Sequence, residues 1–392
     1  MEIVDELKQI PIIKKMRKAR WKHYARRFLL PSWKLKKIEK TYIKDNKIFI
    51  NHLIKNLNET KKIEREAQKV IYTRKIRCDA EKVINDILFW HFVYGFSVNE
   101  YFCYNFYEKT SQERHTYISD REIIMFGYEV NDINKMQIFS DKMRTYKKFK
   151  DYYRRDAICI NKKDDFSLFF EFVKKHPKFV KKEVREACGR SVELIDLTNG
   201  DIDESNLFNS LISKGKTILE EPIIQNSKMS QLNSSSVNTI RCITLLDRDE
   251  IKIPYCFAKI GRQGAFIDNG AAGGILVGID CENGIFVTDG IDELGRRYKT
   301  HPDSGIELIG FQVPEWKQMK KLCKEMSKKI PSVKFIGWDM AYSEKGWVVV
   351  EGNSLSEAIG PQSTFGRGIR GDLVKYLDTC YIPEDKVFCY VD

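Results

Sequence analysis

Hydrophobic and polar positions follow two different patterns along the chain. From residue 1 to about residue 120, apolar side chains recur at spacings of three and four, as at Val83, Ile87 and Leu88, which is typical of amphipathic helices. From about Phe179 onward, short apolar runs rich in β-branched and aromatic residues alternate with turn residues, which favours strands. Helices followed by sheets with intervening helices predict an α+β or mixed α/β architecture.

The second pattern allows individual elements to be predicted. The runs with strand-like composition are residues 237–246, 251–260, 274–280, 285–289 and 335–351. Residues 317–329 have helical spacing, and a last helix is expected over residues 372–378.

The run GWDMAYSEKGWVVVEGN, residues 337–353, places Asp339, Glu351 and Asn353 among apolar residues. If a three-residue loop, residues 344–346, joins two strands with Gly346 in the left-handed region, Asp339 lies opposite Glu351 and shares its face. A two-residue loop would place the two carboxylates on opposite faces. With the longer loop, alternation puts these residues on the other face, as a core: Trp338, Met340, Tyr342, Val348 and Val350.

Two carboxylates at cross-strand distance repel each other unless a cation lies between them or one is protonated. A hard cation such as Mg²⁺ fits two carboxylates and the amide oxygen of Asn353, and Mg²⁺ commonly completes its shell with water and phosphate oxygens. The alternative is that Asp339 and Glu351 only solvate the outer face of a sheet.

Positive charge is concentrated near the N-terminus. The chain has a net charge of +12, and the first 40 residues hold thirteen Lys or Arg against four acidic residues. The remaining body is therefore near neutral, which argues against a nucleic-acid-binding body. Within the basic arm, residues 14–30 interleave eight Lys or Arg with Met16, Trp21, Tyr24, Phe28 and Leu29.

Such an arm has more than one interpretation. Basic and aromatic residues together suit an anionic lipid surface or a phosphorylated carrier, and nucleic acid offers the same phosphates. The alternative is a solvated helix face whose apolar residues pack on the body.

Cysteine usage and hydropathy bear on location. The ten cysteines include no C-x-x-C pair, which favours reduced thiols in a cytoplasmic protein. The start MEIVDELKQIP lacks the apolar region of a secretory signal, and the apolar run over residues 87–96 is too short to span a bilayer. We expect a cytoplasmic location and leave open a peripheral contact of residues 14–30 with the inner membrane surface.

Several motifs in order resemble one protein family. FSDKMRTYKKFK, SVNTIRCITL, FAKIGRQGAFIDNGAAGGILVGID and IGWDMAYSEKGWVVVEGN are similar to the sugar-transfer-associated ATP-grasp family, found near polysaccharide biosynthesis functions, over roughly residues 95–376. The resemblance implies an α+β ATP-grasp fold, with ATP gripped between two subdomains. These would be residues 121–215, with a lysine loop, and residues 216–392, with a hinge strand and a metal-binding hairpin. The basic, mostly helical residues 1–120 would precede them.

The resemblance also implies roles for individual residues. Asp339, Glu351 and Asn353 match the ligands of Mg²⁺, of which two ions are expected with ATP. Nucleotide binding would fall to Lys142, Lys182, Glu220, Glu221, Ile223 and Lys259, with Lys181 as a rival to Lys182. The residues expected near the transferring phosphoryl group are Arg241, Lys259 and Arg262. Because guanidinium groups bind carboxylates and phosphates in pairs of hydrogen bonds, Arg262, Arg367 and Arg370 are candidates for an acid-substrate pocket.

Most ATP-grasp enzymes phosphorylate a carboxylate, and an amine then attacks the acyl phosphate with release of ADP and phosphate. We therefore expect an ADP-forming carboxylate–amine ligase acting in cell-surface polysaccharide or related metabolite synthesis. One alternative is a phosphotransferase acting on a hydroxyl of a sugar or carrier, and another is a non-catalytic ATP-binding scaffold.

Overall fold

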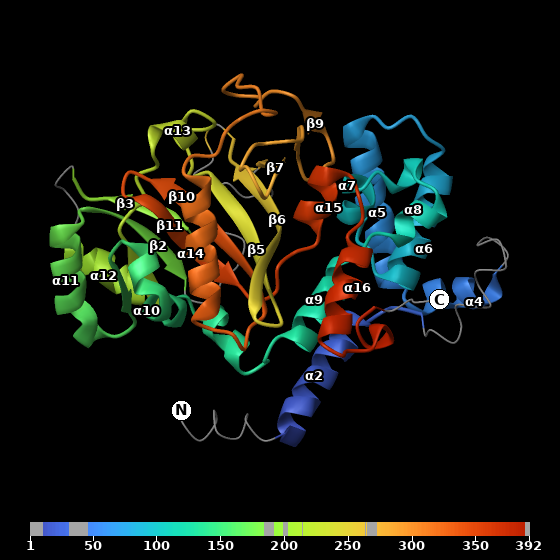
Figure 1. The fold of residues 1–392 in the computed structure, drawn as a ribbon, viewed down its shortest axis with the longest axis horizontal. Helices are drawn as coiled ribbons and strands as arrows, with labels where there is room; N and C mark the ends of the chain where they lie inside the picture. The colour runs from blue at the N-terminus through green and yellow to red at the C-terminus, as the bar shows by residue number, and fades with distance from the viewer. Residues whose placement is uncertain are drawn as a thin grey trace.

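The computed structural model describes residues 11–30, 46–183, 192–198, 203–213, 215–262, 264 and 273–388 (Figure 1). Within these ranges no helix combines the length and the apolar composition needed to cross a bilayer. The eight cysteines that they contain are all free thiols. The lysine loop after residue 183 and residues 1–10 lie outside the described residues.

The N-terminal region is helical, as the sequence predicts. Its helices are α2 (Pro11–Ala25), α4 (Lys47–Lys55), α5 (Leu57–Arg74), α6 (Ala80–Tyr94), α7 (Val98–Cys103), α8 (Ser111–His115) and α9 (Asp120–Val130). The side chain of Asp79 caps the first turn of α6, and Gly95 ends that helix in the left-handed region. The predicted apolar positions Val83, Ile87 and Leu88 of α6 are buried in an aromatic-rich core.

A small antiparallel sheet follows. Its strands, in spatial order, are β1 (Ala157–Ile160), β4 (Thr217–Glu220), β2 (Lys178–Glu183) and β3 (Glu193–Asp196). Helices α11 (Phe166–Lys175) and α12 (Glu204–Ser213) bury their apolar faces in the same core as this sheet. Although β4 follows the predicted subdomain boundary at residue 215, it pairs with β1 and β2 of the first sheet.

A larger antiparallel sheet forms the centre of the molecule. Its spatial order is β11 (Gly346–Asn353), β10 (Phe335–Ser343), β5 (Thr239–Asp247), β6 (Glu250–Ile260), β7 (Ile275–Ile279), β8 (Gly290–Ile291) and β9 (Arg297–Tyr298). Four of the five predicted strand runs map onto these strands. Residues 285–289 are wrong as a strand, because Ile285 and Phe286 form only isolated bridges.

The two faces of this sheet have different coverings, because side chains alternate along each strand. Trp338, Cys242 and Ala258 face a core that also holds residues from α10 (Lys142–Tyr153) and α14 (Trp316–Lys328). Ile243 and Phe257 point to the opposite side, where they pack with residues of α9 and α16 (Arg370–Thr379). Figure 1 shows α10 and α14 on one side of β5 and β10, and α9, α15 (Ile359–Phe365) and α16 on the other. The polar positions discussed below belong to this second side.

In the hairpin of β10 and β11 the predicted loop length is wrong, but the predicted opposition of two carboxylates is confirmed. Ser343 pairs with Gly346, so the loop has two residues rather than three, although Gly346 adopts a positive φ as expected. A β-bulge at Val350 then shifts the register, and Asp339 lies opposite Glu351 after all.

The two-residue turn changes the core. Because Tyr342 pairs with Trp347 and Met340 pairs with Val349, Trp347 and Val349 join Trp338 and Met340 in the buried cluster. The prediction that Val348 and Val350 share that face is wrong.

Helix α15 joins the large sheet to the N-terminal helices. The side chain of Gln362 accepts a hydrogen bond from the backbone of Ile118 and donates one back to its carbonyl, at 2.9 and 2.8 Å. Gln362 also donates to the hydroxyl of Tyr104. On the sheet side, Gly360 lies so close to the ring of Phe257 that a Cβ would stand 2.2 Å from it. The segment after the hairpin is thus held between both parts of the molecule.

We expect Gly360→Ala to lower the free energy of unfolding by about 1–3 kcal/mol, because an added methyl group would have to displace a buried aromatic ring. Gly371→Ala is the matched control, since Gly371 is also the second residue of its helix and has open space around it. That control should be neutral or stabilising by up to about 1 kcal/mol. Urea unfolding of both variants measures the difference, and equal stabilities would contradict the packing described here.

Candidate active site

Three strands of the large sheet bring opposite charges together. Asp339 on β10 is the register partner of Arg241 on β5, and Lys259 lies on the next strand, β6. Arg241 donates from Nε to Asp339 Oδ1 at 2.5 Å and from Nη2 to Oδ2 at 3.0 Å. Lys259 Nζ donates to the same Oδ2 at 3.0 Å. Gly337 makes room for this arrangement, because a Cβ there would stand 3.1 Å from the Arg241 side chain.

This cluster is buried but ionised. Burial alone would raise the pKa of Asp339, yet the charges of Arg241 and Lys259 outweigh it and hold that pKa well below its usual range. Burial likewise opposes the charge of Arg241, and Asp339, Glu357 and Glu351 raise its pKa instead. Arg241 therefore sits among three carboxylates.

The other two predicted metal ligands lie beside this cluster. Glu351 is the cross-strand partner of Asp339, and Asn353 follows two residues later on the same strand. The amide nitrogen of Asn353 donates to Glu351 Oε1 at 3.2 Å. This hydrogen bond uses the nitrogen of the Asn353 amide and not its oxygen. Both side chains are partly exposed, whereas Asp339 is buried. The three predicted ligands are thus brought together.

A second charged cluster lies on the small sheet. Glu220, the last residue of β4, is buried and accepts hydrogen bonds from Lys182 Nζ at 2.8 Å and from Arg155 Nε and Nη2 at 3.2 and 3.1 Å. Burial raises the pKa of Glu220, but Lys182 and Arg155 lower it to about 2. Lys182 and Glu220, two predicted nucleotide-binding residues, are therefore in direct contact.

Arg155 connects the two sheets. Besides Glu220, its guanidinium donates to the carbonyl of Val349 at 2.7 Å and approaches that of Val350 at 3.5 Å, which are the residues of the β11 bulge. It also lies over the ring of Tyr153, 4.5 Å from the centroid. Burial is the main cause that raises the pKa of Tyr153, and the charges of Glu220 and Glu351 add to it. Arg155 thus ties the second cluster to the strand that carries Glu351.

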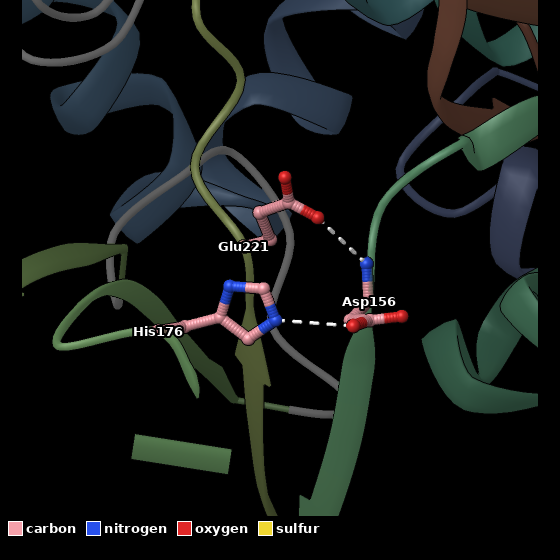
Figure 2. A group of neighbouring side chains, drawn as sticks. All are labelled: Asp156, His176 and Glu221. Carbon is pink, nitrogen blue, oxygen red and sulfur yellow. Dashed lines mark hydrogen bonds and ion pairs between the residues drawn. The ribbon is translucent and has the colours of Figure 1, made fainter. Parts of the chain in front are cut away.

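The chain passes from one sheet to the other beside this junction. Glu221 Oε2 accepts from the backbone nitrogen of Asp156 at 3.1 Å, and His176 Nε2 lies 3.0 Å from Asp156 Oδ2 (Figure 2). Although these three side chains have metal-ligand chemistry, Lys175 neutralises Asp156 at 2.5 Å and Lys345 neutralises Glu221 at 2.7 Å. Lysines therefore balance the negative charges of the two carboxylates. The hydrogen bonds among these residues hold the segment that connects the two sheets.

The remaining nucleotide-binding predictions fall around the same junction. Lys142, the first residue of α10, donates to the carbonyl of Glu183 at 3.2 Å, so it lies where β2 ends. Lys181 extends to Glu193 on β3, away from Glu220, which favours Lys182 as the residue facing the site. Ile223 lies just after β4, in the crossing between the sheets.

The other predicted arginines lie apart from the carboxylate cluster. Arg262 is paired with Asp303, with Nε 2.7 Å from Oδ2. Arg367 pairs with Asp372 and lines a hollow of about 890 Å³ beside the β5–β6 turn. Arg370 is bound to Glu122 of α9 through both carboxylate oxygens and holds the N-terminal region. Their role as a substrate pocket stays a prediction.

Sequence reasoning missed three residues of the junction: Arg155, Tyr153 and Glu357. The stretch YYRRD contains two tyrosines and two arginines in a row, and nothing in it distinguishes Arg155 from its exposed neighbour Arg154. Glu357 lies 3.7 Å from Arg241, and only its position shortly after Asn353 could have drawn attention to it.

Comparison with known families identifies the class of protein. Residues 124–376 match the model of the sugar-transfer associated ATP-grasp proteins. The molecule is therefore an ATP-grasp protein, with two α+β units that meet at the charged junction. More specifically, the chain belongs to the sugar-transfer-associated ATP-grasp family.

Similar solved structures are distant. The D-alanine–D-alanine ligase of Coxiella burnetii is 10% identical, with a TM-score of 0.40 over 63% of this chain and 58% of the ligase. The VanG D-Ala:D-Ser ligase of Enterococcus faecalis is 14% identical, with a TM-score of 0.41 over 63% of this chain and 64% of that one. The chain thus spans less than two thirds of either structure, and no curated protein matches it.

We expect Glu220→Gln to lower the free energy of unfolding at neutral pH by about 3 kcal/mol, because the lost charge leaves Arg155 and Lys182 without their buried partner. Since the pKa of Glu220 is about 2 in the folded state and near its ordinary value when unfolded, its contribution is complete above pH 4.5. It is then lost as the pH falls towards 2. The difference in free energy of unfolding between Glu220→Gln and the unmodified protein, measured by urea unfolding, should therefore become smaller below about pH 4.5.

Glu193→Gln is the control for this prediction, because Glu193 also accepts a lysine from β2 but is largely exposed. Its effect should stay within about 0.5 kcal/mol at every pH. A deficit in Glu220→Gln that does not change with pH would show that the glutamate is not held ionised in the folded protein.

Proposed function

We propose that this protein is an ADP-forming carboxylate–amine ligase of the cytoplasm, working through an acyl phosphate, in the synthesis of cell-surface polysaccharide or a related metabolite. The observation that carries the proposal is the convergence of Asp339, Glu351 and Asn353 with Arg241 and Lys259 on one face of the large sheet. Membership of the sugar-transfer-associated ATP-grasp family supports ATP as the nucleotide.

The donor set suits Mg²⁺. Asp339, Glu351 and Asn353 offer carboxylate and amide oxygens from one strand pair, and such hard ligands are those that Mg²⁺ prefers. These residues would hold Mg²⁺ bound to ATP, and the ions would offset the charge of the phosphate oxygens. Asp339, Glu351 and Glu357 carry one more charge than Arg241 and Lys259 balance, so a cation is favoured here.

The chain's own cations have a second role in this proposal. Arg241 and Lys259 are held on Asp339, ready to meet phosphate oxygens at the start of transfer. On the small sheet, Lys182 and Lys142 would contact the nucleotide phosphates, and the crossing from Glu220 to Ile223 would contact adenine. Because Arg155 ties this crossing to the β11 bulge, nucleotide and metal ligands keep a fixed relation.

The proposed reaction has two steps. A carboxylate oxygen of the acid attacks the γ-phosphorus of ATP, which forms an acyl phosphate as the bond to ADP breaks. The amine then attacks the acyl carbon, the amide bond forms, and inorganic phosphate leaves with the former carboxylate oxygen. Positioning and electrostatic stabilisation supply most of the acceleration in phosphoryl transfer, and the fixed cations suit that task.

We expect Glu351→Gln to reduce phosphate release from ATP at least about 100-fold and to abolish the stabilisation by ATP with Mg²⁺ in a thermal shift, because a metal ligand is lost. Glu344→Gln, an exposed change in the turn of the same hairpin, is the matched control and should behave as the unmodified protein. Equal nucleotide-dependent stabilisation of both variants would remove this hairpin from the nucleotide site.

A screen of acids and amines with ATP tests the reaction itself. We expect inorganic phosphate and an amide product to appear together, in equal amounts, and only when both substrates are present. A phosphorylated product without free phosphate would instead identify a phosphotransferase acting on a hydroxyl. ATP binding with no product, and unaltered cellular function in Asp339→Asn, would indicate a non-catalytic scaffold.

A further inference from the structure

Helix α2 has an inner face that is fully engaged with the protein. Figure 1 shows α2 at the periphery of the molecule, beside α9. Trp21 stacks on Tyr128 of α9 with ring centroids 5.0 Å apart. The inner basic residues meet acids nearby: Lys14 lies 2.7 Å from Asp132, and Lys22 lies 2.8 Å from Glu129. The packing on the body that one interpretation of the basic arm predicts is therefore present on the inner face of α2.

The opposite face of α2 is apolar and exposed along its middle. Ile12 and Met16 are one helical turn apart and are each 66% exposed. Single exposed apolar side chains are common on proteins, but these two are neighbours on one helix face. Of the fourteen large hydrophobic side chains that are exposed among the described residues, eight lie between residues 11 and 74, so exposure is concentrated in this region.

Basic residues border this apolar row on both sides. At 100° per residue, Lys15 falls on one flank of Ile12 and Met16, and Arg20 falls on the other. Arg26 and Arg27 follow in the turn directly after the helix, which ends at Ala25. All four are exposed, and among the described residues none of them has an acidic partner. The helix therefore separates its charges into an inner, neutralised set and an outer, unneutralised set.

A second helix continues the same kind of surface. His52 of α4 binds the carbonyl of Phe28, just after α2, at 2.7 Å. On α4, Ile50 and Ile54 are exposed one turn apart, and Lys47 and Lys55 are exposed at its two ends. An apolar row between cations thus recurs on the helix that is tied to the end of α2.

We propose that the outer face of α2 and the turn after it dock on an anionic phospholipid surface, with Lys15 and Arg20 beside Ile12 and Met16 and with Arg26 and Arg27 in the turn. The cations would meet the lipid phosphates, and the apolar row would enter the boundary between headgroups and acyl chains. Charge complementarity selects this occupant, because four cations have no acid of their own. A nucleic acid would take the cations but would give the exposed Ile12 and Met16 no apolar environment.

Flotation of the full-length protein with vesicles tests this surface. We expect binding to vesicles of phosphatidylcholine mixed with phosphatidylglycerol, little binding to phosphatidylcholine alone, and a decrease as salt rises. Combined Lys15→Gln, Arg20→Gln, Arg26→Gln and Arg27→Gln should lower the partition coefficient by about 1,000-fold. Ile12→Ser with Met16→Ser should lower it by about tenfold, because the apolar contribution is lost.

The matched control removes four charges elsewhere. Lys317→Gln, Lys321→Gln, Lys324→Gln and Lys328→Gln on α14 change the net charge equally and should leave vesicle binding unaltered. An equal loss in both sets, binding to phosphatidylcholine alone, or no binding to either vesicle would overturn the proposal. So would tighter binding to duplex DNA through the same four α2 residues. Nucleotide-dependent thermal stabilisation should persist in the α2 variants, which separates this result from the proposed ligase function.

Discussion

The buried charge of Asp339 is the constraint around which the rest of the site is arranged. A carboxylate without partners at this depth would be strongly unfavourable, and it remains ionised only because Arg241 contacts it from the adjacent strand β5 and Lys259 contacts it from β6, the next strand along the sheet. Replacing such a group by apolar residues often stabilises a protein, so its presence in the centre of a sheet indicates a requirement other than stability. The alternation of the strands satisfies both needs, because the neighbouring positions of β10 face a continuous apolar core.

The bulge in β11 is the second constraint, because it decides which residues accompany Asp339. With a two-residue turn and regular pairing, Glu351 would face the opposite side of the sheet. The extra residue returns it to the side of Asp339 and leaves carbonyl groups that Arg155 binds. Since Arg155 also holds Glu220, the local irregularity of one strand is joined to the end of a strand in the other sheet. Geometry within the hairpin and geometry between the sheets are therefore set by one side chain.

Much of this could be anticipated from the sequence, for physical reasons that can be named. Helical spacing located α6, and Gly346 signalled the turn, because both depend on local properties of the chain. The opposition of Asp339 and Glu351 was predicted for an incorrect loop, since a bulge leaves no local signature in a run of valines. Arg155 could not be found, because its role depends on a tertiary contact with Glu220, 65 residues away. The family resemblance supplied the candidates, and only coordinates separate Lys182 from Lys181.

The basic N-terminal segment shows how one composition can serve two environments. Along α2, Lys14 and Lys22 face acids of the body, whereas Lys15 and Arg20 lie on the outer arc. Net charge cannot reveal this division, because it follows from the helical period and from where the acids of α9 and its following loop are placed. The inner pairs fix the helix on the body, and the outer cations then need no rearrangement to meet an anionic surface. Rigid attachment of that kind limits the conformational entropy lost on docking. A small cluster of charges can therefore act together on one anionic surface.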